Sequence, residues 1–191
     1  WVRVSAGLSD VAAKNGVKVG CLLSVPFSHT VIPSQYWRND YAKLFYYLLE
    51  KGTDGHYKWT DKLVRFMKYY GVNGIGINSE FNSDEEGMQD ILGFFEECHK
   101  KAEAIGWEFQ VHWYDLMSTE GNISFANYLG GHNRGIFGEK DHKKVDMFFL
   151  NYNWSHSQLS NSARLAKTMG RSPYDVYAGF DIQGRALEMN A

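Results

Sequence analysis

The sequence of 191 residues is poor in cysteine, in net charge and in long apolar runs. Its two cysteines, Cys21 and Cys98, form no metal-ligand spacing and indicate no redox compartment, so we expect both to be buried free thiols. The formal net charge of −2 supplies no basic field for nucleic acid or for an anionic membrane. No apolar run approaches the roughly 20 residues that cross a bilayer. The sequence therefore predicts neither a nucleic-acid partner nor membrane insertion.

Several catalytic motifs are also missing. None of the seven histidines stands in the HxH or HExxH spacing of a metal site. No serine lies in a GxSxG turn, so a serine nucleophile is unsupported. Gly74 and Gly76 lie inside an apolar run and do not fit the GxGxxG turn that holds phosphates. We expect no metal and no cofactor.

Aromatic residues, in contrast, are abundant: 12 tyrosines, 12 phenylalanines and 6 tryptophans make up 16% of the chain. They are consistent with a large aromatic core. They are equally consistent with a sugar-binding site, because the apolar faces of sugars stack on aromatic rings whose polar tips reach hydroxyl groups. Composition leaves both interpretations open.

One structural unit recurs along the chain, in which a helical stretch ends at a glycine and a short apolar run follows. The predicted helices cover residues 9–15, 61–70, 84–105 and 157–169, and the apolar runs cover residues 17–25, 72–78, 107–115, 145–152 and 175–181. Glycine after the last helical turn adopts the left-handed conformation without steric cost. Helices alternating with short apolar runs predict βα units around a parallel sheet.

Polar and aromatic residues gather where these runs end. The run ends are Asn78-Ser79-Glu80, Trp113-Tyr114-Asp115, Asn151-Tyr152-Asn153-Trp154 and Asp181. The carboxyl ends of barrel strands carry active sites, and without a glycine-rich phosphate turn a barrel is favoured over a doubly wound sheet. We therefore predict an α/β fold, part of a (β/α)8 TIM barrel, in which residues 1–191 form one incomplete domain. A closed barrel has eight strands and five are visible, so the remaining strands are expected elsewhere.

Glu80 is the main candidate for a catalytic acid. In a strand, residues i and i+2 face the same side, so Asn78 and Glu80 would both project into the barrel mouth. The alternative is that Glu80 opens the following helix as a first-turn acid. Asp115 could supply a second carboxylate, as in two-carboxylate glycosidases, or could serve as a helix cap or a buried structural acid.

Four of these segments, in order, resemble motifs of the family 85 glycoside hydrolases, which are endo-β-N-acetylglucosaminidases with a barrel fold. The segments are Gly74-Ile75-Gly76-Ile77-Asn78-Ser79-Glu80, Trp113-Tyr114-Asp115-Leu116-Met117, Phe149-Leu150-Asn151-Tyr152 and residues 176–185. The stretch Asn15-Gly16-Val17-Lys18-Val19 is similar to a further family segment. The resemblance covers nearly the whole chain and implies that its strands are barrel strands three to seven.

The resemblance implies cleavage of the β-1,4 bond in the GlcNAc-GlcNAc core of N-linked glycans, with N-glycans or glycoproteins as substrate. Such enzymes are retaining and substrate-assisted, so the 2-acetamido oxygen of the sugar attacks and no protein carboxylate does. Glu80 would then protonate the leaving oxygen and activate water. Asn78 would hold the acetamido N–H, and Tyr114 would hydrogen-bond the same group.

The resemblance also implies a set of substrate-binding positions. They are Trp113, Asp115, Phe125, Asn151, Trp154 and Asp181. Trp113 and Trp154 are candidate sugar platforms, with core packing as the alternative, and Asp115 would orient neighbouring groups rather than attack. The chain departs from the family at Phe125, where tryptophan is usual, and at Asn153, where an aromatic is more frequent, which leaves glycan preference open.

Two other functions remain alternatives. One is a two-carboxylate retaining glycosidase that uses Glu80 and Asp115. The other is a non-catalytic barrel that binds glycans on Trp113 and Trp154. Localisation also stays open, because family members include exported or cell-surface bacterial enzymes and cytoplasmic eukaryotic ones.

Overall fold

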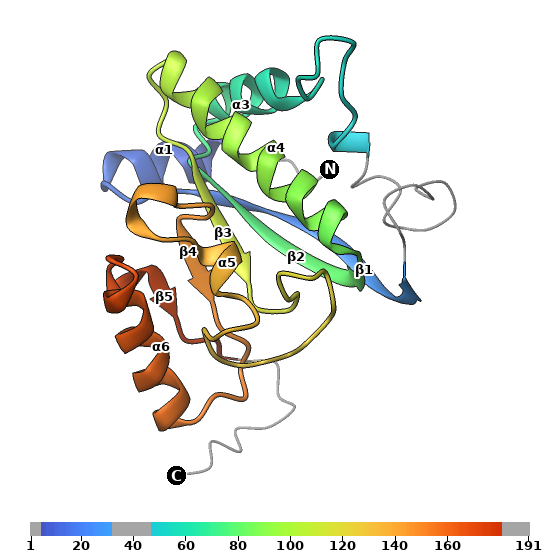
Figure 1. The fold of residues 1–191 in the computed structure, drawn as a ribbon. Coiled ribbons are helices and arrows are strands. Elements are labelled where there is room, and N and C mark those ends of the chain that lie inside the picture. The colour runs from blue at the N-terminus through green and yellow to red at the C-terminus, as the bar shows by residue number, and fades with distance from the viewer. Residues whose placement is uncertain (1–4, 32–46, 181–191) are drawn as a thin grey trace.

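The structure, a computed structural model, describes residues 5–31 and 47–180. Its elements follow the predicted alternation of helices and strands (Figure 1). In chain order they are α1 (Ala6–Lys14), β1 (Gly20–Val31), α3 (Thr60–Tyr69), β2 (Gly74–Asn82), α4 (Glu85–Ala104), β3 (Gln110–Tyr114), α5 (Arg134–Phe137), the 3₁₀ helix η2 (Lys140–His142), β4 (Met147–Phe149), α6 (His156–Thr168), the 3₁₀ helix η3 (Pro173–Asp175) and β5 (Val176–Tyr177).

The five strands form one parallel sheet in the order β1-β2-β3-β4-β5. Each strand pairs with the next along the chain, so the winding never reverses. A doubly wound sheet has a reversal of strand order where its ligand binds, whereas a barrel adds each strand on the same side. The described sheet is therefore part of a (β/α)8 barrel, as the sequence predicts.

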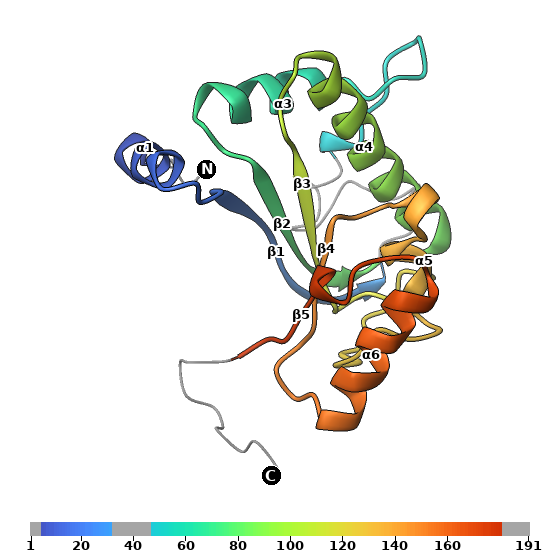
Figure 2. The ribbon, with the colours of Figure 1, turned by 90° about the vertical axis from the view of Figure 1, so that its left-hand side faces the viewer.

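Helices α3, α4 and α6 cover one side of the curved sheet, and the opposite, concave side faces away from them (Figures 1 and 2). Along β2 the burial alternates: Ile75, Ile77 and Ser79 are buried, while Asn78 and Glu80 are partly exposed. Because successive side chains point to opposite faces of a strand, the first set faces the helices and the second faces the concave side.

The predicted helix ends are confirmed. The glycines after α1, α3, α4 and α6 all have positive φ angles, between 61° and 72°, at Gly16, Gly71, Gly106 and Gly170. Asp84, the residue before α4, caps that helix by accepting a hydrogen bond from the Gly87 N–H at 2.7 Å. Glu80 lies within β2, so it does not open the helix that follows.

The first strand, β1, is longer than the apolar run of residues 17–25 predicts. In the structure β1 continues to Val31, with shifts in pairing register between Val25 and Ser28 and between Ser28 and Val31. The strand thus accommodates Pro26 beside an irregular part of its pairing with β2.

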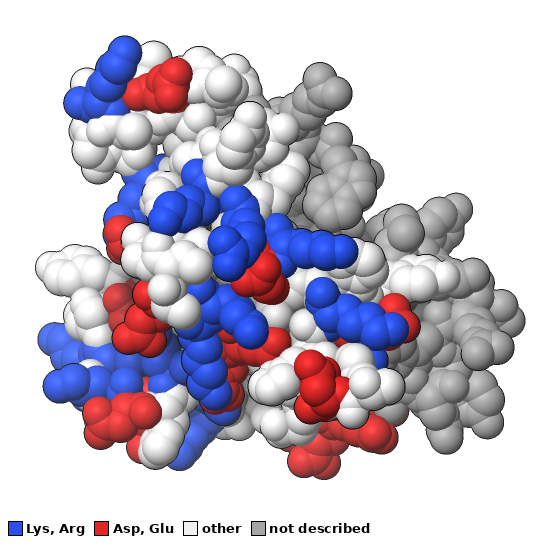
Figure 3. All heavy atoms as spheres, turned by 90° about the horizontal axis from the view of Figure 1, so that it is seen from above, with Lys and Arg blue, Asp and Glu red and all other residues white. Residues whose placement is uncertain are grey.

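Figure 3 shows the molecule from above, relative to the view of Figure 1. On this face Lys and Arg are interspersed with Asp and Glu. Ion pairs also join residues of the same helix, including Arg65 with Asp61 and Lys100 with Glu96 at 2.8 and 2.9 Å. In the part of the chain that the structure describes, no helix combines the length and the apolar character that crossing a membrane requires.

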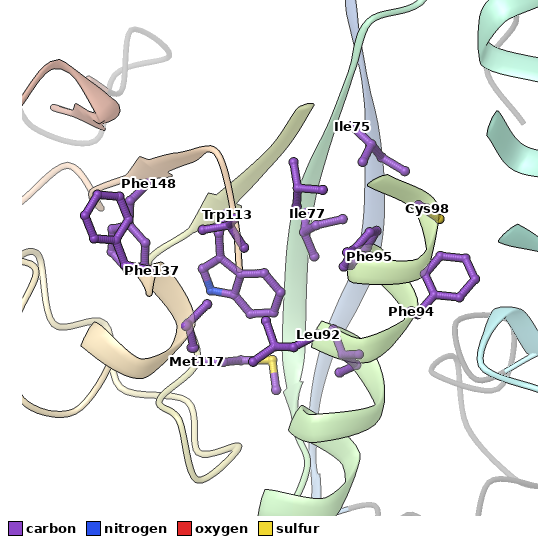
Figure 4. Packing of buried hydrophobic residues seen from close by; sticks show 14 of the residues in the cluster. Ile75, Ile77, Leu92, Phe94, Phe95, Cys98, Trp113, Met117, Phe137 and Phe148 are labelled. Carbon is purple, nitrogen blue, oxygen red and sulfur yellow. The ribbon is translucent and has the colours of Figure 1, made fainter. Parts of the chain in front are cut away.

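A cluster of buried apolar side chains fills the space between sheet and helices (Figure 4). Leu92, Phe95, Cys98 and Ala102 of α4 are all buried in it, as their helical spacing predicts. Cys98 is a buried free thiol, and Cys21 is a free thiol of intermediate exposure. The aromatic-core interpretation of the composition is therefore correct for several phenylalanines, among them Phe94, Phe137 and Phe148.

Candidate functional site

The site begins with Asn78 and Glu80 on the concave face of β2. The Asn78 side-chain N–H donates to Glu80 Oε1 at 3.0 Å, which confirms that both side chains point the same way. The same amide nitrogen lies 3.5 Å from the Ser24 hydroxyl oxygen on β1, where Ser24 and Asn78 are paired across the strands. Asn78 Oδ1 is buried and has no hydrogen-bond partner among the described residues. This amide therefore orients Glu80 and holds one buried hydrogen-bond acceptor without a partner among the described residues.

Tyr114 ends the neighbouring strand, β3, on the same concave face. Its hydroxyl donates to Asn151 Oδ1 at 2.6 Å, and Asn151 is 3% exposed just beyond β4. Burial is the main reason that the pKa of Tyr114 is raised, and the nearby Tyr152 and Glu80 add to the rise. The phenol therefore stays protonated near neutral pH. The structure brings Asn78, Glu80, Tyr114 and Asn151 to the carboxyl ends of three consecutive strands.

Asp115 does not belong to this face, although it was expected among the substrate contacts. Its side chain is 0% exposed, and Asp115 Oδ1 accepts a hydrogen bond from the Asn133 side chain at 2.7 Å. Burial raises the pKa of Asp115 to about 7, although the Asn133 hydrogen bond opposes the rise. Asp115 follows β3 directly and is buried, so it does not reach the concave face that Tyr114 lines, and its expected role in orienting neighbouring groups stays a prediction.

The prediction that Trp113 is a sugar platform is wrong, because this side chain is buried on the side of the sheet that faces the helices. Its side chain is 1% exposed and lies in the core between sheet and helices, near Ile77, Leu92 and Met117 (Figure 4). No ring face is left for a sugar to stack upon. The alternative interpretation, core packing, is correct for this residue.

Phe125 lies in the long segment that follows β3, with 47% of its surface exposed. Phe125 and Asn127 both have positive φ angles, 39° and 60°, which are uncommon for residues with side chains. The Asn127 side chain bridges the segment, donating to the Phe125 carbonyl at 2.8 Å and accepting from the Asn153 N–H at 3.1 Å. Phe125 is thus presented on a constrained segment tied to the residues that follow β4.

Trp154 is only partly buried, and its indole N–H donates to the Gly179 carbonyl at 2.9 Å. This bond ties the segment after β4 to the one after β5. The ring also meets Phe180 edge-on, with the two ring centroids 5.6 Å apart. The prediction that Trp154 binds sugar stays open, and Asp181 lies outside the described residues.

Ser24 and Asn133 are contacts that the sequence did not reveal. Ser24 sits inside an apolar run with no motif to mark it, and its relevance follows only from its pairing with Asn78. Asn133 lies 18 residues beyond Asp115 in a loop, so only the fold brings the two together. Predicting these two contacts would have required the strand pairing of β1 with β2 and the path of the loop that carries Asn133.

A shallow apolar hollow continues the concave face away from these polar groups. It is lined by Leu22, Gly76, His112, Met147, Phe149 and Tyr177. Burial lowers the pKa of His112, which keeps this imidazole neutral near pH 7. Within residues 5–31 and 47–180, no three His, Cys, Asp or Glu side chains are grouped so that they could hold a metal ion.

Together, the fold and the site define a βα-barrel protein with a carboxyl, an amide and a phenol at the carboxyl ends of its strands. The chain belongs to glycosyl hydrolase family 85, whose model matches residues 5–191. The resemblance noted in the sequence motifs is thereby confirmed.

Individual relatives agree with this family. Cytosolic endo-beta-N-acetylglucosaminidase 2 of Arabidopsis thaliana is 29% identical over 127 residues, which are 66% of this chain and 17% of that protein. Cytosolic endo-beta-N-acetylglucosaminidase of Homo sapiens is 27% identical over 125 residues, 65% of this chain and 16% of that protein. The glycoside hydrolase domain of Endo-D from Streptococcus pneumoniae R6 is similar in structure, with a TM-score of 0.75 and 27% identity over 91% of this chain and 27% of that one. The chain thus spans about a sixth of the length of these curated relatives.

Proposed function

We propose that the protein containing this chain is an endo-β-N-acetylglucosaminidase that cleaves the β-1,4 bond of the GlcNAc-GlcNAc core of N-linked glycans. The observation that carries the proposal is the Asn78–Glu80 hydrogen bond of 3.0 Å at the mouth of a family 85 barrel. Relatives from Arabidopsis and human are named for the same activity. The expected substrate is an N-glycan or an N-glycoprotein.

The mechanism that fits these residues is retaining and substrate-assisted. The acetamido oxygen of the sugar attacks its own anomeric carbon while Glu80 protonates the leaving oxygen, and Glu80 then takes a proton from the incoming water. An internal nucleophile reacts faster because it is already positioned. Asn78, whose Oδ1 has no partner among the described residues, accepts the acetamido N–H as positive charge develops there.

The burial of Asp115 argues against the two-carboxylate alternative. A protein nucleophile must reach the anomeric carbon, with the two carboxyl groups about 5–5.5 Å apart across the sugar. Asp115 is enclosed on the helix-facing side and bonded to Asn133. Replacing the acetamido group of the substrate by a hydroxyl discriminates the two mechanisms: substrate assistance predicts loss of cleavage, and a protein nucleophile predicts that cleavage persists.

The direct test is mass spectrometry of an N-glycoprotein incubated with the full-length protein. A product that retains one GlcNAc on asparagine supports the proposal. Glu80→Gln should lower the rate by about 10²–10⁴-fold because it removes the proton donor. Glu103→Gln, a change at an exposed position on α4, is the control and should leave the rate unchanged. Unaltered glycoprotein across high-mannose and complex glycans, or full activity of Glu80→Gln, would contradict the proposal.

The names of the relatives also bear on where the protein acts. The plant and human relatives are named cytosolic, whereas Endo-D comes from a bacterium. We propose that a eukaryotic source would place this protein in the cytoplasm and a bacterial source at the cell surface or outside. Fractionation of source cells, followed by detection of the protein, tests this.

A further inference from the structure

The Tyr114 hydroxyl is already engaged before any sugar arrives. It donates to Asn151 Oδ1 at 2.6 Å, and Asn151 is almost completely buried behind it. A neutral phenol has a single proton, so a hydroxyl that donates to Asn151 presents only lone pairs to the rest of the site. Tyr114 therefore faces the concave side as a hydrogen-bond acceptor, so its expected hydrogen bond to the acetamido group can use only the N–H, which it would share with Asn78.

The direction of this proton matters for the proposed reaction. When the acetamido oxygen attacks the anomeric carbon, it gives up electron density and positive charge spreads over the acetamido group. A hydroxyl proton aimed at that oxygen would hold back its lone pair, whereas an oxygen acceptor near the group stabilises the charge that develops. A Tyr114 proton turned away from the sugar therefore favours attack.

We propose that Asn151 is a positioning residue, which fixes the Tyr114 ring and keeps the hydroxyl proton turned away from the acetamido oxygen. This inference rests on the proposed function and gives Asn151, which the resemblance implies as a substrate-binding position, a role that acts through Tyr114. The alternating side chains of β4 and the segment after it support it: Phe149 faces Tyr114, and Asn151 two residues later lies on the same side. The raised pKa of Tyr114 also ensures that the proton is present to be directed.

A double-mutant cycle in the full-length protein tests the inference, since it separates action through Tyr114 from a purely structural effect. Asn151→Leu has a similar volume but no acceptor, and it should lower kcat about tenfold with little change in KM, the size expected for one hydrogen bond. In a Tyr114→Phe background, which has no hydroxyl to direct, the same change should have no further effect. Asn161→Leu on the exposed side of α6 is the matched control and should leave both constants unchanged.

Asn151→Asp keeps an oxygen acceptor in the same place and should retain activity within about threefold of wild type. It also carries the test if Asn151→Leu does not fold, as judged by circular dichroism. A tenfold loss caused by Asn151→Leu both in the wild-type background and in the Tyr114→Phe background would overturn the inference, as would an equal loss in Asn151→Asp. A folded wild-type protein without any turnover would instead overturn the proposed function and this inference with it.

Discussion

Neighbouring residues at the end of β3 have different environments because successive side chains point to opposite faces. Tyr114 faces the site, while Trp113 and Asp115 face the helices. The pairing of Asn78 with Glu80 could be predicted from their i, i+2 spacing alone. The orientation of Trp113 also follows from an alternation, because Phe109, Val111 and Trp113 occupy every second position between polar residues in the run of residues 107–115.

Asp115 gives a prediction at the residue scale. Its folded-state pKa of about 7 lies above the ordinary value of 3.8, so the folded protein holds a proton that the unfolded chain releases. Between pH 4 and 7 this group should lower the free energy of unfolding by up to about 1.4 kcal/mol per pH unit as pH rises. Asp115→Asn resembles the protonated acid and keeps an acceptor for Asn133. The free energy of unfolding of this variant should therefore change less with pH over this range.

Urea denaturation at several pH values measures these slopes. At pH 8 the Asp115→Asn protein should be more stable than wild type, and near pH 4 the two should converge. Parallel curves for the two proteins over the whole range would show that Asp115 is already ionised at low pH, contrary to the prediction.

At the scale of elements, the segment after β3 is held against the start of α4. Gly121 has a φ of 85°, and its carbonyl accepts from the Ser83 N–H at 2.8 Å. A Cβ at Gly121 would lie 2.8 Å from the Asp84 nitrogen and from the Ser83 carbonyl carbon, both of which are backbone atoms. The helices and their glycine ends could be predicted from local sequence, whereas this contact between distant backbones could not.

Gly121→Ala should therefore destabilise the fold by about 2–4 kcal/mol, because it combines a strained φ with a backbone clash. Gly131→Ala is the matched control, since a Cβ there meets nothing within 4 Å, and it should change the stability by less than about 1 kcal/mol. Thermal melts of both variants measure the difference. Equal melting temperatures for the two variants would show that the segment shifts without cost.

At the scale of the whole molecule, Asp146 joins three parts of the fold at the opposite end of the sheet from the site. Its carboxylate accepts hydrogen bonds from His99 on α4 at 2.7 Å, from the Val111 N–H on β3 at 2.7 Å and from Lys143 at 2.6 Å. Burial alone would raise the pKa of Asp146, but these three donors outweigh it and lower the pKa to about 2. The barrel itself could be predicted from its repeated units. This junction could not, because the partners of Asp146 lie 3 to 47 residues from it in the sequence.

The lowered pKa of Asp146 predicts acid sensitivity. The stabilisation is complete above the unfolded value of 3.8 and is lost as pH falls towards 2. Asp146→Asn should lower the free energy of unfolding by about 2 kcal/mol at pH 7, with the difference from wild type shrinking below pH 4. Asp141→Asn on the exposed η2 helix is the control, and chemical denaturation at pH 7 and pH 3 measures both. A difference that persists undiminished at pH 3 would contradict this account.

The alternation along β3 has a consequence for how such a chain can change in length during evolution. Loss or gain of one residue between Gly106 and Tyr114 would turn the phenol towards the helices and bring the Trp113 indole or the Asp115 carboxyl towards the concave face. Substitutions within the strand leave each side chain on its face, but single-residue insertions and deletions move the following side chains to the opposite face. Changes of length are compatible with the site only in the connecting segments, such as the one that carries Phe125. In these segments the side chains do not have to alternate between two faces.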